Sequence, residues 1–464
     1  MLRKRIKLLS TNNVNLEFTK KAMTAYGGFG LIAKFMEKLD FRKHLTEAIP
    51  FVESSPNATG VYTKIIRFGL TVLAGGKRFS HCMFLGDSLE VYETEFGLDR
   101  MPKSISAVTR FFAKFKDQKI VEMFSDGVWD FTIKKVFTLS KIKEDYLTFD
   151  STVLTRYGEQ EGVDIGYNPK KRGRPSHHPI LAFLNRSRLI INLWNRPGST
   201  SSGNGIVEFA KQGIFRLGGL IKILGVLADS GFYEEMFLKF LEAEKLEYVI
   251  AAKLYRTLQS RISEIMEWTT VDIDIEVAEF YFQHKDWDLS RRYVVIRQKI
   301  SDEKKVPQGR QLKLFKEDEN ISQFRYGLYV TSCPKPAIEI WRTYRLRAAD
   351  EGVIKEFKYD FGLEGFSLDG FYPTEAAMIL RALFYNLMEI FCQLFLGRDE
   401  AGINFNTFRM KYLLIPSVLG RDGKEIVLRM AVRSQTLKSK ICWIIEQIEG
   451  LPPNALHLEN PATN

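Results

Sequence analysis

Cysteine and histidine are scarce in this sequence, with 4 Cys and 6 His among 464 residues. The four cysteines, Cys82, Cys333, Cys392 and Cys442, are scattered and form no C-x2-C pair. This spacing excludes a disulfide framework and a zinc ribbon, and the histidines form no ligand pattern with the cysteines. We expect the cysteines to be reduced thiols in the protein core.

Long uninterrupted apolar runs are also missing. The most apolar stretch, residues 376–397, contains Arg381, Asn386, Glu389 and Gln393. Such groups are costly within a bilayer, so the stretch predicts a buried helix and not a membrane span. The basic amino-terminal arm, residues 1–20, lacks the apolar segment and cleavage site of a signal peptide. We therefore expect a cytoplasmic protein with no membrane partner.

Positive charge is in excess, with 67 Lys and Arg against 56 Asp and Glu and a net charge of +11. A balance of this sign favours a polyanionic partner such as nucleic acid, although a merely basic soluble protein remains an alternative. Hydrophobic residues make up 45% of the chain, which is enough for a sizeable core. The length suits about three domains.

Residues 27–139 follow the helical repeat of apolar residues. Within residues 101–118, Pro102 and Ser104 are helix start signals, and Lys103 and Arg110 lie off the apolar stripe. One interpretation is the second helix of a helix-turn-helix that binds a DNA groove. The alternative is a core helix with a solvated basic face. The apolar stripe consists of Val108, Phe111, Phe112 and Phe115.

Two apolar, strand-like runs end in an acid. Residues 146–152 contain Asp150, and residues 221–233 contain Asp229 before a Ser-Gly turn. A carboxylate at the end of a buried strand is costly unless it is paired or binds a cation. Two such acids, together with a third from a helix, predict an oxygen-rich site of the kind that Mg²⁺ prefers.

Residues 341–363 predict one helix that ends at Gly362. Tyr344, Arg347, Glu351 and Lys358 fall at offsets of 0, 3, 7 and 14, within roughly 60° of one another on a helix surface. They therefore point the same way. On spacing alone, a solvated face of neighbouring opposite charges is the more ordinary interpretation.

With both upstream acids in place, the chain resembles the DDE-type transposases of bacterial insertion sequences that carry a Y-x2-R-x3-E-x6-K signature. Tyr344, Arg347, Glu351 and Lys358 match all four positions. Asp150 and Asp229 stand where this family has its first and second acids, and residues 176–204 resemble its hairpin and following loop. The resemblance covers roughly residues 141–396.

The resemblance implies an α/β fold, in which a ribonuclease-H-like mixed sheet is split by a β-rich insertion and preceded by an all-helical amino-terminal domain. The residue patterns agree, because strands and helices alternate over residues 141–254 and alternating β-prone runs follow to residue 333. We expect a DNA-end-binding domain over 1–140, a catalytic core over 141–255 and 335–400, the insertion over 256–334, and a helical or mixed segment over 401–464.

The resemblance also implies the chemistry. Asp150, Asp229 and Glu351 would hold two Mg²⁺ ions, for which Mn²⁺ can substitute, and the other three signature residues would contact phosphates near the cut. The expected partners are double-stranded DNA with terminal inverted repeats, target DNA and a second copy of the chain. The expected reaction is cut-and-paste transposition, and the protein is expected to associate with the bacterial nucleoid.

A basic loop follows the first catalytic strand, and two interpretations stay open for it. Its RGRP core resembles a minor-groove AT-hook, which favours DNA contact; the alternative is a charged surface loop. The residues in question are Lys170, Lys171, Arg172 and Arg174.

Two other functions compete with an active transposase. One is a transposase-derived DNA-binding protein without catalysis, and the other is a stand-alone nuclease of the same fold. The presence of all three acids disfavours the first, and the large helical region disfavours the second.

Overall fold

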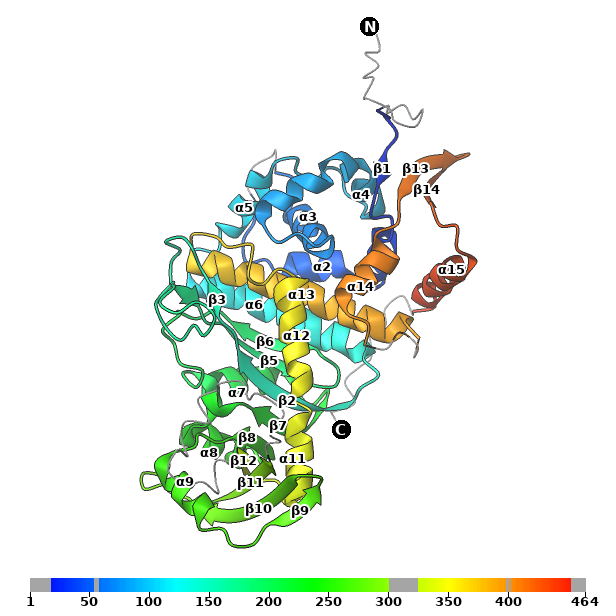
Figure 1. Cartoon of the computed structure of the whole chain (residues 1–464). Coiled ribbons are helices and arrows are strands. Elements are labelled where there is room, and N and C mark those ends of the chain that lie inside the picture. The colour runs from blue at the N-terminus through cyan, green and yellow to red at the C-terminus, as the bar shows by residue number, and fades with distance from the viewer. Residues whose placement is uncertain (1–17, 54–57, 300–323, 398–399, 401, 452–464) are drawn as a thin grey trace, which may run out of the picture.

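The computed structural model describes residues 18–53, 58–299, 324–397, 400 and 402–451. Helices from the first third of the chain form one layer, the mixed sheet lies beside them, and the β-rich strands form the far end of the molecule (Figure 1). The amino-terminal arm expected over residues 1–20 lies almost wholly outside the described residues.

The amino-terminal region is built from short amphipathic helices packed around phenylalanines. Ser104 caps the fifth helix by accepting a hydrogen bond from the Ser106 N–H, and the predicted apolar stripe is buried. The helix expected within 101–118 occupies only Ile105–Phe112. The helices are α1 (Phe29–Lys38), α2 (Phe41–Glu47), α3 (Val61–Leu73), α4 (Leu89–Glu95), α5 (Ile105–Phe112) and α6 (Gln118–Phe131), with tighter or wider turns at Phe79–Ser88, Thr132–Val136 and Phe137–Leu139.

One half of the mixed sheet has the strand order β6-β5-β2-β7-β8, with β6 at the edge. Strands β2, β7 and β8 are parallel, and β5 and β6 pair antiparallel as a hairpin. This is the arrangement expected of a ribonuclease-H-like core, and the prediction of that fold is confirmed. The strands are β2 (Glu144–Ser151), β5 (Ile180–Leu184), β6 (Ile190–Trp194), β7 (Lys222–Ala228) and β8 (Tyr248–Ala251); α7 (Ile206–Leu217) and α8 (Glu235–Ala243) connect them, and a small ladder joins β3 (Leu154–Thr155) to β4 (Ser176–His177).

The β-rich strands extend this sheet. Strand β12 pairs antiparallel with β8, so that nine strands of the described chain form one continuous sheet. The domain boundaries given above therefore stay predictions. The elements are α9 (Arg256–Ser263), β9 (Thr269–Asp272), β10 (Ile275–Phe282), β11 (Arg291–Lys299) and β12 (Phe324–Thr331).

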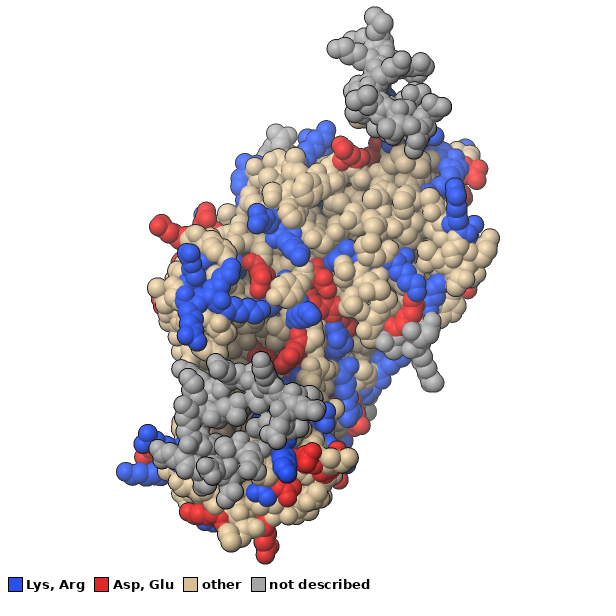
Figure 2. All heavy atoms as spheres, in the orientation of Figure 1, with Lys and Arg blue, Asp and Glu red and all other residues tan. Residues whose placement is uncertain are grey.

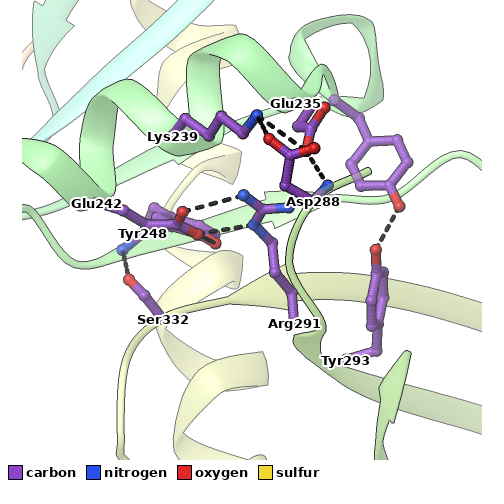
Figure 3. A network of polar contacts seen from close by, with 9 residues as sticks. Glu235, Lys239, Glu242, Tyr248, Asp288, Arg291, Tyr293 and Ser332 are labelled. Carbon is purple, nitrogen blue, oxygen red and sulfur yellow. Dashed lines mark hydrogen bonds and ion pairs between the residues drawn. The ribbon is translucent and has the colours of Figure 1, made fainter. Parts of the chain in front are cut away.

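A polar network fastens the β-rich strands to helix α8 (Figure 3). Arg291 on β11 donates two hydrogen bonds to the Glu242 carboxylate, at 2.7 and 3.0 Å. The Tyr248 hydroxyl also donates to Glu242, at 2.7 Å. Nearby, the Tyr233 and Tyr293 hydroxyls lie 2.5 Å apart. These contacts hold the far end of the sheet in a fixed position relative to the core.

The single helix expected over 341–363 is wrong, because the segment forms two helices, α11 (Ala337–Arg345) and α12 (Ala348–Tyr359). At the junction the backbone hydrogen bonds span three residues, as in a 3₁₀ turn, and the Arg347 N–H donates to the Tyr344 carbonyl. The Leu346 carbonyl accepts from the Ala349 N–H at 3.1 Å and also from the Asn185 side chain at 2.9 Å. Gly362 has the left-handed conformation expected of a glycine after a helix, two residues beyond the cap residue Asp360.

The apolar stretch forms the buried helix α13 (Phe371–Phe395), which lies between the helical layer and the sheet (Figure 1). Among the described residues it alone has the length and hydropathy to cross a membrane, but 78% of its most apolar window is buried inside the molecule. The prediction of a core helix is confirmed.

The carboxyl-terminal segment, expected to be helical or mixed, contains two strands as well as helices. The two strands form a hairpin that pairs with a two-residue strand near the amino terminus, so the amino-terminal region is helical with this one exception. The elements are α14 (Phe405–Phe408), a wide turn at Arg409–Leu413, β13 (Ser417–Asp422), β14 (Glu425–Met430), α15 (Gln435–Glu449) and β1 (Met23–Thr24).

The expectation that all cysteines are core thiols is only partly right. Cys82 and Cys333 are buried and Cys392 is partly buried, whereas Cys442 is exposed. Cys442 lies on α15, whose buried positions are Ile441, Ile444 and Ile448, so it belongs to the solvent side of that helix.

Candidate active site

The first two acids lie side by side because of strand register. Strands β2 and β7 are parallel, and Phe149 pairs with Ala228. Asp150 and Asp229 directly follow this pair, so the two acids occupy equivalent positions on strands about 4.8 Å apart. Both leave the carboxyl edge of the sheet, which is where α/β folds bind ligands.

Asp150 is held by one backbone group and one cation. Its Oδ1 accepts from the Ser151 N–H at 2.7 Å, and its Oδ2 accepts from Arg347 Nη2 at 2.9 Å. Burial raises the pKa of Asp150 to about 6; the Arg347 guanidinium opposes that shift, and the Asp229 carboxylate adds to it. Ionised Asp150 therefore depends on a nearby positive charge.

Asp229 is more open, with 39% of its side chain exposed. Its Oδ1 accepts from the Gly231 N–H at 2.8 Å, and its Oδ2 lies 3.9 Å from Arg347 Nη2. A Cβ added to Gly231 would come within 2.8 Å of Ser202, so only glycine lets this turn pack so closely. The Ser202 hydroxyl also lies 2.9 Å from that of Ser151, so the loop that carries Ser202 contacts the residues that follow both acids.

Helix α12 carries the third acid and is anchored by its buried side. Asp350 is 1% exposed and accepts from Asn185 Nδ2 at 2.6 Å. Burial raises the pKa of Asp350 to about 7. Nearly two turns further on, Glu356 pairs with Arg188 of the same hairpin loop. The loop that joins β5 to β6 thereby fixes α12, and it leaves Glu351 on the exposed side.

The acids open into a cleft of about 1190 Å³. Figure 2 shows basic side chains along the edge of a hollow beneath the helical layer and acidic side chains inside it. The lining includes the acids Asp150, Asp229 and Glu351 and the basic residues Lys77, Arg78, Lys170, Lys171, Lys355 and Lys358.

The other predicted residues are placed differently. Tyr344 packs on Tyr329, with ring centroids 4.4 Å apart, and does not line the cleft. Lys358 donates to the Val153 carbonyl at 3.1 Å and lies 3.2 Å from Glu364. Arg347 pairs with the acids. Arg172 and Arg174 are exposed on the loop that carries the cleft lysines, and Lys103 and Arg110 are exposed on the helical layer outside the cleft.

Sequence reasoning missed four residues of this region, namely Asp350, Asn185, Lys77 and Arg78. Asp350 had a detectable signal, because it shares a helix stripe with Val353 and Phe357, at spacings of 3 and 7, and an acid on an apolar stripe needs a partner. Asn185, Lys77 and Arg78 carry no such signal, since only folding brings their segments here.

The donor set fits hard divalent cations. Carboxylate oxygens are the ligands that Mg²⁺ and Mn²⁺ prefer. One guanidinium already lies within 4 Å of both Asp150 and Asp229, which shows that a single positive group can serve the two acids together. Among the described residues, no three Asp, Glu, His or Cys side chains lie close enough together to form a preformed metal cluster. Arg347 occupies the position beside Asp150 and Asp229 instead.

No curated protein matches the chain. Among solved structures, the piggyBac transposase in a synaptic complex with hairpin DNA is similar, with 15% identity, a TM-score of 0.47, and coverage of 96% of this chain and 90% of that one. The fold assignment rests on the strand order described above. The family model for transposase DDE domain group 1 matches residues 6–452. The chain therefore belongs to the transposase DDE domain group 1 family.

Proposed function

We propose that this transposase cuts DNA at the ends of a bacterial insertion sequence and joins those ends to target DNA by a cut-and-paste route. The observation that supports this is the meeting of Asp150, Asp229 and Glu351 in one open cleft with lysines around it. An open, cation-edged cleft suits a long polyanion better than a small substrate.

The three acids are proposed to hold two Mg²⁺ or Mn²⁺ ions. Bound there, divalent ions would activate a water or a DNA 3′-hydroxyl and stabilise the leaving oxygen. Glu351 lies on a helix that Asp350 and Glu356 anchor, which gives it a defined position relative to the two strand acids. Fixed positions of this kind are what in-line phosphoryl transfer requires.

Arg347 and Lys358 are proposed to bind phosphates beside the cut. Lys358 is oriented by the Val153 carbonyl and Glu364 on the cleft wall. The Arg347 guanidinium lies beside the acids. If bound cations displace it from the acids, its planar group of donors is suited to two-point contact with a phosphate. Tyr344, on the preceding helix, packs on Tyr329 and interacts with Arg347 through its hydroxyl, so we propose that it positions Arg347.

The exposed basic residues outside the acids are proposed to contact the DNA flanks. The loop residues Lys170, Lys171, Arg172 and Arg174 adjoin the cleft, and Lys103 and Arg110 present positive charge on the helical layer. We further propose that two copies of the chain bind two inverted-repeat ends, because end pairing needs two sites. Light scattering of the DNA complex tests that stoichiometry.

The deciding experiment uses a labelled duplex that carries the end of the element encoding this chain, with Mg²⁺ or Mn²⁺ present. We expect the wild type to nick at the element boundary, and Glu351→Gln and Asp150→Asn to bind but not nick. Binding without nicking by the wild type would favour a catalytically inactive DNA-binding protein. Nicking without regard to the end sequence would favour a general nuclease.

A further inference from the structure

One wall of the cleft comes from the amino-terminal helical layer, through the segment Gly75-Gly76-Lys77-Arg78 that precedes the tight turn Phe79–Ser88. We propose that Lys77 and Arg78 bind the phosphate backbone of the DNA strand that passes the catalytic acids. This inference rests on the proposed function and names a DNA-contact site outside the catalytic core.

The segment is locked onto the loop that follows the catalytic helix. The Phe366 N–H donates to the Lys77 carbonyl at 3.1 Å. A Cβ added to Gly365 would lie 1.7 Å from that carbonyl oxygen, so the two backbones touch and only glycine fits. The buried Arg381 donates to the Gly362 and Gly365 carbonyls at 2.7 and 2.9 Å and fixes the loop from beneath.

Aromatic packing anchors the segment on its other side. Phe79 is the residue directly after Arg78, and its ring lies 5.3 Å from that of Phe366 and 5.8 Å from that of Phe68. Gly75 has a φ of +90°, which lets the chain leave α3 and turn toward the cleft. The backbone positions of Lys77 and Arg78 are therefore set by the core, while their side chains remain free.

Both side chains are exposed, and within the described part of the chain neither has an ion-pair partner or a side-chain hydrogen bond. Asp360 is close enough for the Lys77 charge to oppose the rise in the Asp360 pKa that burial causes. A fixed backbone that presents unpaired cations to a cleft is suited to an anionic ligand, because little order has to be gained on binding. Isolated surface cations on mobile loops lack this feature.

The ligand chemistry follows from the opposite wall. Lys170 and Lys171 line the cleft from the loop after β3, and Lys355 and Lys358 line it from α12. Cations from three separate segments therefore line the same cleft as the carboxylates. A linear chain of phosphates can contact these walls in succession, whereas a single small anion would reach only one of them. This arrangement commits the site to a nucleic-acid backbone.

The test is the salt dependence of DNA binding in the absence of divalent metal. Fluorescence anisotropy with the element-end duplex, from about 50 to about 200 mM salt, gives the slope of log affinity against log salt. Each lost phosphate contact reduces the steepness of that slope by about 0.9 for duplex DNA, so Lys77→Gln/Arg78→Gln should reduce it by about 2. Two controls are matched to it: Lys77→Arg/Arg78→Lys keeps both charges, and Arg421→Gln/Lys424→Gln removes two exposed charges at the β13–β14 hairpin.

We expect both controls to retain the wild-type slope. An unchanged slope for Lys77→Gln/Arg78→Gln would overturn the inference, and so would an equal loss in the hairpin control, because the effect would then be one of net charge. Nicking of the same duplex by the wild type and Glu351→Gln is measured separately. If nicking fails and the slope still falls by about 2, the proposed function fails and the phosphate site stands.

Discussion

The Arg347 guanidinium donates to the Asp150 carboxylate at 2.9 Å and lies 3.9 Å from Asp229, so the two strand acids share one positive charge. The same group lies 4.0 Å from the buried Asp350. Three carboxylates thus share one fixed positive charge. This relationship lets the acids converge without a bound cation, and it makes Arg347 a competitor for whatever cation they bind.

Removal of that competitor should strengthen divalent-metal binding. An ion pair of this kind contributes about 1 kcal/mol, so Arg347→Gln should bind Mn²⁺ about fivefold more tightly in calorimetric titration without DNA. Arg345→Gln removes a neighbouring exposed arginine on α11 and should bind Mn²⁺ like the wild type. Equal affinities in all three proteins would show that Arg347 does not oppose the metal.

The hairpin loop should control catalysis through Asn185. Asn185→Ala removes the donor to Asp350, whose other carboxylate oxygen already lacks a hydrogen-bond partner among the described residues. We expect a loss of about 2 kcal/mol in the free energy of unfolding and slower nicking, while the salt slope of DNA binding is unchanged. Adding Asp350→Ala should cost less than the sum of the single changes, because both partners are then gone. Strict additivity would argue against their coupling.

The close contact between the helical layer and the loop that follows α12 should make stability sensitive to one added methyl group. Gly365→Ala would place a Cβ 1.7 Å from the Lys77 carbonyl oxygen. We expect a loss of about 2 kcal/mol or more in urea unfolding, since backbone atoms must move. Gly86→Ala is the matched control, because a Cβ there meets no atom within 4 Å. Equal stability of the two variants would mean that the contact is looser than described.

Glu95 should make stability depend on pH. Burial raises its pKa from 4.5 to about 8, and its carboxylate oxygens have no hydrogen-bond partner among the described residues. A carboxyl group with a raised folded-state pKa contributes stability that is full below the unfolded pKa and lost as pH rises through the folded pKa. Glu95→Gln, which cannot ionise, should therefore become increasingly more stable than the wild type as the pH rises from about 4.5 to about 8.

The gain at the upper end should be about 5 kcal/mol. Urea unfolding at several pH values measures it. Glu90→Gln, an exposed change on the same helix, should show no such rise. A Glu95→Gln advantage that is the same at every pH would mean that the effect is not ionisation.

Local patterns predicted most of the elements. The hairpin β5–β6, the strands that precede Asp150 and Asp229, and the buried helix α13 were all expected, because apolar alternation and run length report burial directly. The break between α11 and α12 was not predicted. Leu346 and Arg347 are ordinary helical residues, and the break accompanies the bond that Asn185, about 160 residues away in sequence, makes to the Leu346 carbonyl.

The sequence by itself determined which residues are proposed to do the chemistry, namely the acids Asp150, Asp229 and Glu351 and the basic signature residues, because type and spacing are local properties. Tertiary structure alone decided that Arg347 rests on the acids, that Asp350 is buried beside them, and that Lys77 and Arg78 reach the cleft. These relationships join segments far apart in the chain. They depend on strand register and on backbone contacts such as that of Gly365 with Lys77, for which the sequence carries no periodic signal.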